Sequence, residues 1–175
     1  MNTLIVVFLL GIGATAAMDL WSILRKSLLG IAPPNYGMVG RWLAYMPHGK
    51  FRHDSIAASA PIKREHYIGW IAHYLIGIVF AAVLIAVAGK PWILNPTIGP
   101  ALMVGVGTVV APFLLMQPGM GAGIASSRTL KPNSARLHSL INHAVFGLGL
   151  WVGTKTLPLH TGMIRKRIKL RFRAA

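Results

Sequence analysis

Two histidines stand in similar apolar surroundings, seventy residues apart. Residues 70–80 read WIAHYLIGIVF and residues 140–150 read LINHAVFGLGL, so His73 and His143 each begin a His-x-x-x-Gly pattern. A histidine is costly in a segment otherwise suited to lipid, and ionisable residues inside membranes are typically functional. The two segments therefore predict a polar site between two similar helices.

Asp19 is the acidic residue that lies within an apolar segment. With a rise of about 1.5 Å per helical residue, Asp19, His73 and His143 fall at similar depths, about 7 to 11 Å from one end of their helices. An unpaired carboxylate would be costly in lipid, so a histidine is its natural partner. We expect one ligand or proton site formed by Asp19, His73, His143, Asn142 and Gln117.

Three interpretations of this cluster compete. In the first, hydrogen bonds between helices fix their register and do nothing else. In the second, the residues move protons or bind a cation or small solute. In the third, His73 and His143 hold a b-type haem, with glycines four residues later letting the porphyrin approach. These residues do not identify a particular cofactor. His73 and His143 are also the candidate metal ligands.

Composition indicates a membrane protein. Of 175 residues, 54% are apolar and only 12% are charged, which lies outside the range of ordinary soluble domains. The net charge of +15 does not indicate nucleic acid, because the basic residues sit between long apolar runs. Cysteine is absent, and no Ser/His/Asp order, carboxylate pair or His-Glu-x-x-His pattern favours a hydrolytic enzyme.

Apolar segments long enough to cross a hydrocarbon core of about 30 Å recur along the chain. They cover residues 3–24, 68–89, 97–117 and 136–157. Pro100 and Pro112 predict a kink or a locally unwound turn in the third segment. Residues 35–46 predict a helix lying along the membrane surface. The expected fold is all-α: a polytopic membrane protein whose domain, residues 1–158, is a four-transmembrane-helix bundle.

The first segment also has a competing interpretation as a cleaved signal peptide, because residues 14–16 resemble a small-residue cleavage site. However, no Lys or Arg precedes the apolar run, while Arg25 and Lys26 follow it. We therefore expect this segment to be retained as a membrane span.

The two halves of the chain predict an internal repeat. Identical residues recur at an offset of seventy: Met46 and Met116, Gly49 and Gly119, Ile71 and Ile141. At an offset of ninety-four, residues 11–13 correspond to residues 105–107. These matches predict two similar helical hairpins related by an axis along the membrane normal. Chance similarity between apolar helices is the competing explanation.

Basic residues set the expected orientation. Loops one and three hold ten Lys and Arg against one in loop two, so we expect them in the cytoplasm. The basic tail, residues 159–175, argues against this orientation, because its cations would then lie on the other side. Its basic residues are expected to face anionic lipid head groups: Arg165, Lys166, Arg167, Lys169, Arg171 and Arg173.

Loop one contains further basic residues and a histidine pair. The basic side chains of Arg41, Lys50, Arg52, Lys63 and Arg64 are expected to form a solvated rim facing lipid phosphates. His48, His53 and Asp54 lie close together in the sequence, but this is a weak metal pattern. A surface loop is the favoured interpretation.

Several stretches carry a family resemblance: GIGATAAMDLW, VGRWLAYMPHGKFRHDSIA, GWIAHYLIG, QPGMGAGIASS and NHAVFGLGL. In these the chain resembles a family of small bacterial inner-membrane proteins catalogued only as a domain of unknown function. The resemblance extends to about residue 158. It implies four spans and the bacterial cytoplasmic (inner) membrane, and it implies no activity, ligand or catalytic residue.

Together these features favour a multi-pass membrane protein that is transport-related or handles a small solute, an ion or protons. The alternative is a haem-bearing or accessory structural subunit of a larger membrane complex. Four helices scarcely enclose a pathway, so a transporter of this size would be expected to form a homodimer. The expected partners are the lipid bilayer and its anionic head groups, and catalysis is not favoured.

Overall fold

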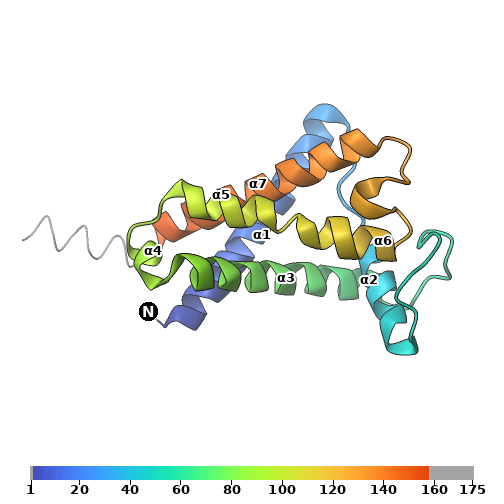
Figure 1. Ribbon diagram of the computed structural model, residues 1–175, viewed down its shortest axis with the longest axis horizontal. Helices are drawn as coiled ribbons and strands as arrows, with labels where there is room; N and C mark the ends of the chain where they lie inside the picture. The colour runs from blue at the N-terminus through green and yellow to red at the C-terminus, as the bar shows by residue number, and fades with distance from the viewer. Residues whose placement is uncertain (1, 158–175) are drawn as a thin grey trace, which may run out of the picture.

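The structure is a computed structural model that describes residues 2–157. Over this part of the chain it is all-helical and contains no strand. Four long helical segments run along the length of the molecule and alternate in direction (Figure 1). They are α1 (Thr3–Leu29), α3 (Glu65–Ala88), α5 (Ile98–Gly107) with its continuation, and α7 (Pro132–Thr156). The shorter elements are α2 (Tyr36–Tyr45), η1 (Met46–His48), α4 (Lys90–Leu94), η2 (Pro112–Met116), α6 (Gln117–Gly119) and η3 (Ile124–Ser126).

Within residues 2–157, three helices are long and apolar enough to cross a membrane: Thr3–Leu29, Glu65–Ala88 and Ile98–Gly119. Large apolar side chains cover their outer faces, including Phe8 at 52% exposure and Met103 at 72%. An apolar outer surface of this extent is what a lipid-facing protein presents. The chain is therefore a membrane protein of the all-α class. The α7 helix is as long but more polar, so the fourth span and the paired hairpins remain predictions.

The α1 helix extends past the predicted end of the first span at residue 24. It continues to Leu29 and ends where Gly30 adopts a left-handed conformation, with φ of 65°. Arg25, which was counted among the basic residues of loop one, is buried. Its side chain is only 4% exposed, and Nη1 donates to Oδ1 of Asn142 on α7 at 3.3 Å. The basic residue is thus part of the α1–α7 contact.

The third span is broken at one of its two prolines, as predicted. The α5 helix ends at Gly107, and the chain continues through a turn into the wider π-helical segment η2, which begins at Pro112. Pro100 leaves α5 intact because it lies in the first turn, where backbone N–H groups have no helical partner. After the break, η2 and α6 run toward α2 and loop one.

A helix forms near residues 35–46, as predicted, and it packs tightly against α3. The Asn35 side chain caps α2 by accepting from Met38 N at 3.3 Å. Gly40 and Gly69 lie at the crossing of α2 and α3, where a Cβ on either glycine would overlap the backbone of the other helix. The position of α2 along a membrane surface stays a prediction.

Arg41 anchors loop one. The assignment of Arg41 to a solvated rim was therefore wrong. The Arg41 side chain is 14% exposed and forms a two-pronged ion pair with Glu65, with Nη2–Oε1 and Nε–Oε2 distances of 2.7 and 2.8 Å. Its Nη1 also donates to the carbonyls of Ile56 and Ser59. The Glu65 hydrogen bonds raise the pKa of Arg41 above its ordinary value. Arg41 therefore fixes the fold of the loop rather than facing lipid.

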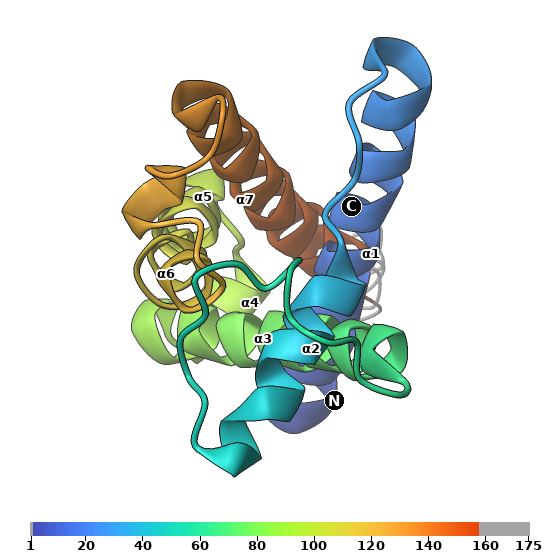
Figure 2. The same cartoon turned by 90° about the vertical axis from the view of Figure 1, so that its right-hand side faces the viewer.

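The core lies where the long helices cross. Leu10, Leu84 and Leu150 are fully buried there, together with Phe146. Toward the end of the molecule that faces the viewer in Figure 2, the second half of α1 and the first half of α7 diverge. Loop one, α2 and α6 gather at the same end. A cavity at this end is lined by residues of α1, α2, α3, η2 and α7.

Candidate functional site

The predicted partnership of Asp19 with a histidine is present at this end of the bundle. Oδ1 of Asp19 lies 3.0 Å from Nε2 of His73 and accepts from the Tyr36 hydroxyl at 3.3 Å. Oδ2 accepts from the Tyr74 hydroxyl at 2.9 Å. The two side chains of the pair are 14% and 10% exposed, respectively. One carboxylate therefore joins α1, α2 and α3.

Tyr36 connects this pair to the surrounding helices. Its hydroxyl is 2.9 Å from Nε2 of His73, and its ring stacks on the imidazole with centroids 4.2 Å apart. Burial, together with the charge of Asp19, raises the pKa of the Tyr36 hydroxyl above its ordinary value. Tyr36 consequently stays protonated and available as a hydrogen-bond donor to the carboxylate.

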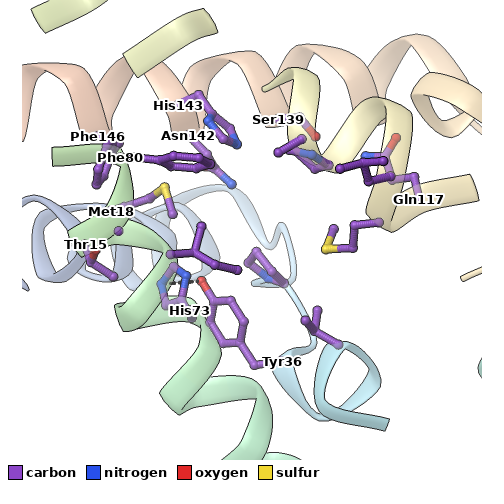
Figure 3. A pocket seen from close by; sticks show the side chains of 18 of the residues that line it. Thr15, Met18, Tyr36, His73, Phe80, Gln117, Ser139, Asn142, His143 and Phe146 are labelled. Carbon is purple, nitrogen blue, oxygen red and sulfur yellow. Dashed lines mark hydrogen bonds between the residues drawn. The ribbon is translucent and has the colours of Figure 1, made fainter. Parts of the chain in front are cut away.

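A cavity of about 430 Å³ separates His73 from His143. Its walls are mainly apolar and come from α1, α2, α3, η2 and α7. Figure 3 shows His143, Asn142 and Phe146 on one wall, with His73 and Tyr36 opposite them. Such a space, with apolar walls and a few convergent polar groups, is typical of small-molecule sites, which measure about 300 to 1,000 Å³.

The hydrogen bond to Thr108 decides which ring nitrogen of neutral His143 carries the proton. Thr108 Oγ1 lies 2.9 Å from Nδ1 of His143 and donates its own proton to the Gly105 carbonyl at 2.6 Å. The hydroxyl can then only accept from the imidazole, so neutral His143 carries its proton on Nδ1. Its Nε2 is left as an acceptor on the cavity side of the ring.

Two side-chain amides complete the polar part of the wall. Arg25 binds Oδ1 of Asn142, so the Asn142 amide nitrogen is the end that points into the cavity (Figure 3). Gln117 also lines the cavity, and its Oε1 is buried without a hydrogen-bond partner in the described part of the chain. The wall therefore offers a donor at Asn142 and an acceptor at His143, and Gln117 adds a further side-chain amide.

Comparison with known proteins gives one family. Residues 8–157 match the family described as "Protein of unknown function (DUF2938)". The chain belongs to this family. No curated protein and no solved structure matches it. The DUF2938 match spans every residue of the site, from Thr15 to Phe146.

In this DUF2938 protein the predicted site residues gather at one end of the bundle but do not form a single hydrogen-bonded cluster. Asp19 and His73 are directly bonded, and Asp19 lies behind His73 rather than in the cavity wall. His143, Asn142 and Gln117 line the same cavity, and the hydrogen bond of the His143 imidazole goes to Thr108.

Sequence reasoning missed four residues that hydrogen-bond to the predicted site residues: Tyr36, Tyr74, Arg25 and Thr108. Tyrosine and threonine are ordinary in apolar helices, and Arg25 was counted among the basic residues that follow the first apolar segment. The position of Tyr74 next to His73 was the one available signal.

The haem interpretation fits this geometry poorly. Nε2 of His73 is already hydrogen-bonded to Asp19 and Tyr36, so iron ligation through it would break both contacts. Within residues 2–157, no group of three or more His, Cys, Asp or Glu side chains is arranged to hold a metal ion.

The basic residues Arg165 to Arg173, expected to face lipid, lie outside the described residues.

Proposed function

We propose that this protein binds a small amphipathic molecule in the cavity between α3 and α7, and that binding is linked to protonation of the Asp19–His73 pair. The observation that carries the proposal is the cavity itself, because apolar walls meet two histidines from opposite sides. A site that served only to fix helix register would be expected to pack closed.

The polar groups indicate the class of ligand. Asn142 offers an amide donor, while the nitrogen of neutral His143 that carries no proton is an acceptor. A ligand that both accepts and donates satisfies them, such as an alcohol, an amide or a protonated acid. Met18, Phe80 and Phe146 would cover its apolar part. The ligand is therefore a small amphipathic molecule rather than a bare metal ion.

The proton step rests on the position of His73. Its imidazole lines the cavity on one side and contacts Asp19 at 3.0 Å on the other. A bound ligand would exclude water from the imidazole, which disfavours its charged form and favours release or transfer of a proton. Asp19, held by two tyrosine hydroxyls, is the neighbouring acceptor. Ligand binding and proton occupancy are coupled in this arrangement.

The proposal includes α7 as a fourth span, with loops one and three in the cytoplasm of a bacterial inner membrane. The excess of basic residues in these loops supports it, as does their contact at one end of the bundle, where His53 N donates to Gly119 O at 2.9 Å. Reporter fusions after Gly89 and within residues 118–135 test the orientation. An externally active fusion in the latter loop would contradict it.

We also propose that the two hairpins arose by duplication. Gly11 packs on the α3 backbone at Ile78, and Gly105 packs on the α7 backbone at Gly147. Residues 11 and 105 correspond at the offset of ninety-four, and residues 77 and 147 correspond at the offset of seventy. The close glycine contacts of the two hairpins therefore lie at corresponding positions to within one residue, and a homodimer would enlarge the pathway between the hairpins.

A pair of adjacent tryptophan substitutions tests the ligand proposal. Ala111 lines the cavity, whereas Val110 is 54% exposed on the outer face. Ala111→Trp should fill the cavity, while Val110→Trp adds the same side chain toward lipid. Wild-type and variant proteins are purified from cell membranes in mild detergent, and retained small molecules are measured by native mass spectrometry after removal of the micelle.

We expect wild type and Val110→Trp to retain the same small molecule and Ala111→Trp to lose it. Matched helix content and melting temperature in the three proteins would exclude misfolding as the cause. Equal retention by Ala111→Trp would contradict ligand binding in this cavity.

A further inference from the structure

A second, polar pocket of about 570 Å³ lies where loop one meets the segment that follows α6. It shares no residue with the cavity between His73 and His143. Its charged and polar walls come from both loops: Lys50, Arg52, His53, Asp54, Ser55 and Arg128. The two loops are separate in sequence, so the pocket exists only in the folded protein.

Positive charge in this pocket is not neutralised internally. Lys50, Arg52 and Arg128 face one carboxylate, Asp54. The ion pairs found within residues 2–157 are Arg41–Glu65 and Asp19–His73, so neither arginine of the pocket is paired with a carboxylate. The Lys50 ammonium lies 5.4 Å above the Tyr45 ring. A concave surface with this charge attracts anions.

His53 is the buried group of the pocket, at 7% exposure. Its Nδ1 lies 2.9 Å from Oγ of Ser59, whose own proton is donated to the Ser55 carbonyl at 3.2 Å. The imidazole must therefore donate from Nδ1 when neutral, which leaves Nε2 without a proton. That Nε2 is buried and has no hydrogen-bond partner in the described chain.

The backbone holds the two walls in place. His53 N donates to Gly119 O at 2.9 Å, and Ile56 N donates to Met120 O at 3.0 Å. Gly121, with φ of 92°, packs directly on the carbonyl of Asp54, where no side chain would fit. The loops therefore present their cations from a fixed frame, which lowers the entropic cost of binding an anion.

We propose that this pocket binds a phosphate group, carried either by a lipid head group or by a soluble phosphorylated molecule. The guanidinium groups of Arg52 and Arg128 match the phosphate oxygens as forked donors, and Lys50 adds a point charge. Protonation of the buried His53 at Nε2 as the anion enters adds a further positive charge behind the inner wall. Anion binding is thereby linked to uptake of one proton.

The surroundings of His53 agree with this linkage. Burial and the nearby Lys50 lower the pKa of His53 below its ordinary value, and Asp54 partly opposes them. The Tyr45 ring packs edge-on against the imidazole, with centroids 4.9 Å apart, and the Ser59 hydroxyl holds its other nitrogen. Arg52 and Arg128 complete the charged groups of the pocket. An anion would offset these cations and raise the pKa of His53 again.

Inorganic sulfate is the first probe, because its charge is constant across the pH range in which histidine titrates. The full chain is placed in phosphatidylcholine nanodiscs, and sulfate binding is measured by calorimetry. We expect saturable binding with Kd in the range of about 1 mM. Arg52→Gln/Arg128→Gln should weaken it about tenfold or more, since each guanidinium makes charge-assisted hydrogen bonds.

Lys63→Gln/Lys131→Gln is the matched control. It also removes two positive charges from loops one and three, but neither residue lines the pocket. In this control, sulfate affinity should fall by less than about threefold, because screened surface charges have a weak effect. Equal losses in both double variants, or no saturable sulfate binding to the wild type, would overturn the proposal.

The proton linkage and the source of phosphate are tested on the same samples. Wild-type affinity for sulfate should rise as pH falls from about 7.5 to about 5.5, and His53→Gln should remove most of this rise. A pH dependence unchanged in His53→Gln would refute the role of this histidine. Adding phosphatidic acid to the nanodisc separates the sources: suppressed sulfate binding assigns the site to a lipid head group. Competition by glucose 6-phosphate alone assigns it to a soluble molecule.

Discussion

Replacing Asp19 with alanine should destabilise the bundle strongly. The carboxylate accepts from Tyr36 and Tyr74 and contacts His73, so its removal leaves donors on two helices without their acceptor. Breaking a buried pair by deleting one partner costs about 3 to 5 kcal/mol. Asp19→Asn keeps the shape and one acceptor but removes the charge, for which we expect a smaller loss of about 1 to 3 kcal/mol.

The free energy of unfolding can be measured by titrating purified protein in mixed micelles with SDS and following helix content. Tyr74→Phe removes a single hydrogen bond to a charged group, worth about 1.5 to 3 kcal/mol. Asp54→Ala is the control, because that carboxylate is exposed and makes no side-chain hydrogen bond within residues 2–157. Its effect should lie within about 0.5 kcal/mol. If Asp19→Ala and Asp54→Ala unfold alike, the network is not structural and our account of it is wrong.

Three further outcomes follow from the same geometry. Gly40→Val should destabilise the protein by about 1 to 3 kcal/mol or more, since the added atoms meet the α3 backbone, whereas Gly13→Val enters open space and should not. The free energy of unfolding of the wild type should fall as pH drops below about 6.5, because the lowered pKa of His53 makes the folded state bind fewer protons than the unfolded one. In anion-free buffer, His53→Gln should reduce this dependence of stability on pH. An unchanged dependence in His53→Gln would count against the role of His53. In liposomes loaded with a pH-sensitive dye, Asp19→Asn should slow ligand-dependent proton movement while Asp54→Asn does not, and equal rates in both variants would argue against Asp19 as the proton acceptor.

The pairing of Asp19 with His73 could be predicted from the sequence for a simple reason. A polar residue in lipid must find a partner, and a fixed rise per residue gives the depth of each side chain along its helix. The same arithmetic brought His143, Asn142 and Gln117 to the same end of the bundle. The position of Pro112 likewise predicted the break in the third span.

The contributions of Tyr36 and Arg25 could not be obtained in this way. The apolar spacing of α2 is the same whether the helix lies on a membrane surface or packs on α3, so its sequence does not reveal the contact of Tyr36 with His73. A basic residue after an apolar run usually marks the membrane boundary. Only the crossing of α1 and α7 turns Arg25 inward to Asn142. Such tertiary contacts carry no periodic signal.

The measurement that tests the central claim most directly is a crystal structure of the protein purified from its native membrane and crystallised from a lipidic mesophase. We predict non-protein density in the cavity between His73 and His143, in contact with the Asn142 amide, and an intact Asp19–His73 contact. A cavity closed by the surrounding side chains, or His143 turned into lipid, would contradict the account.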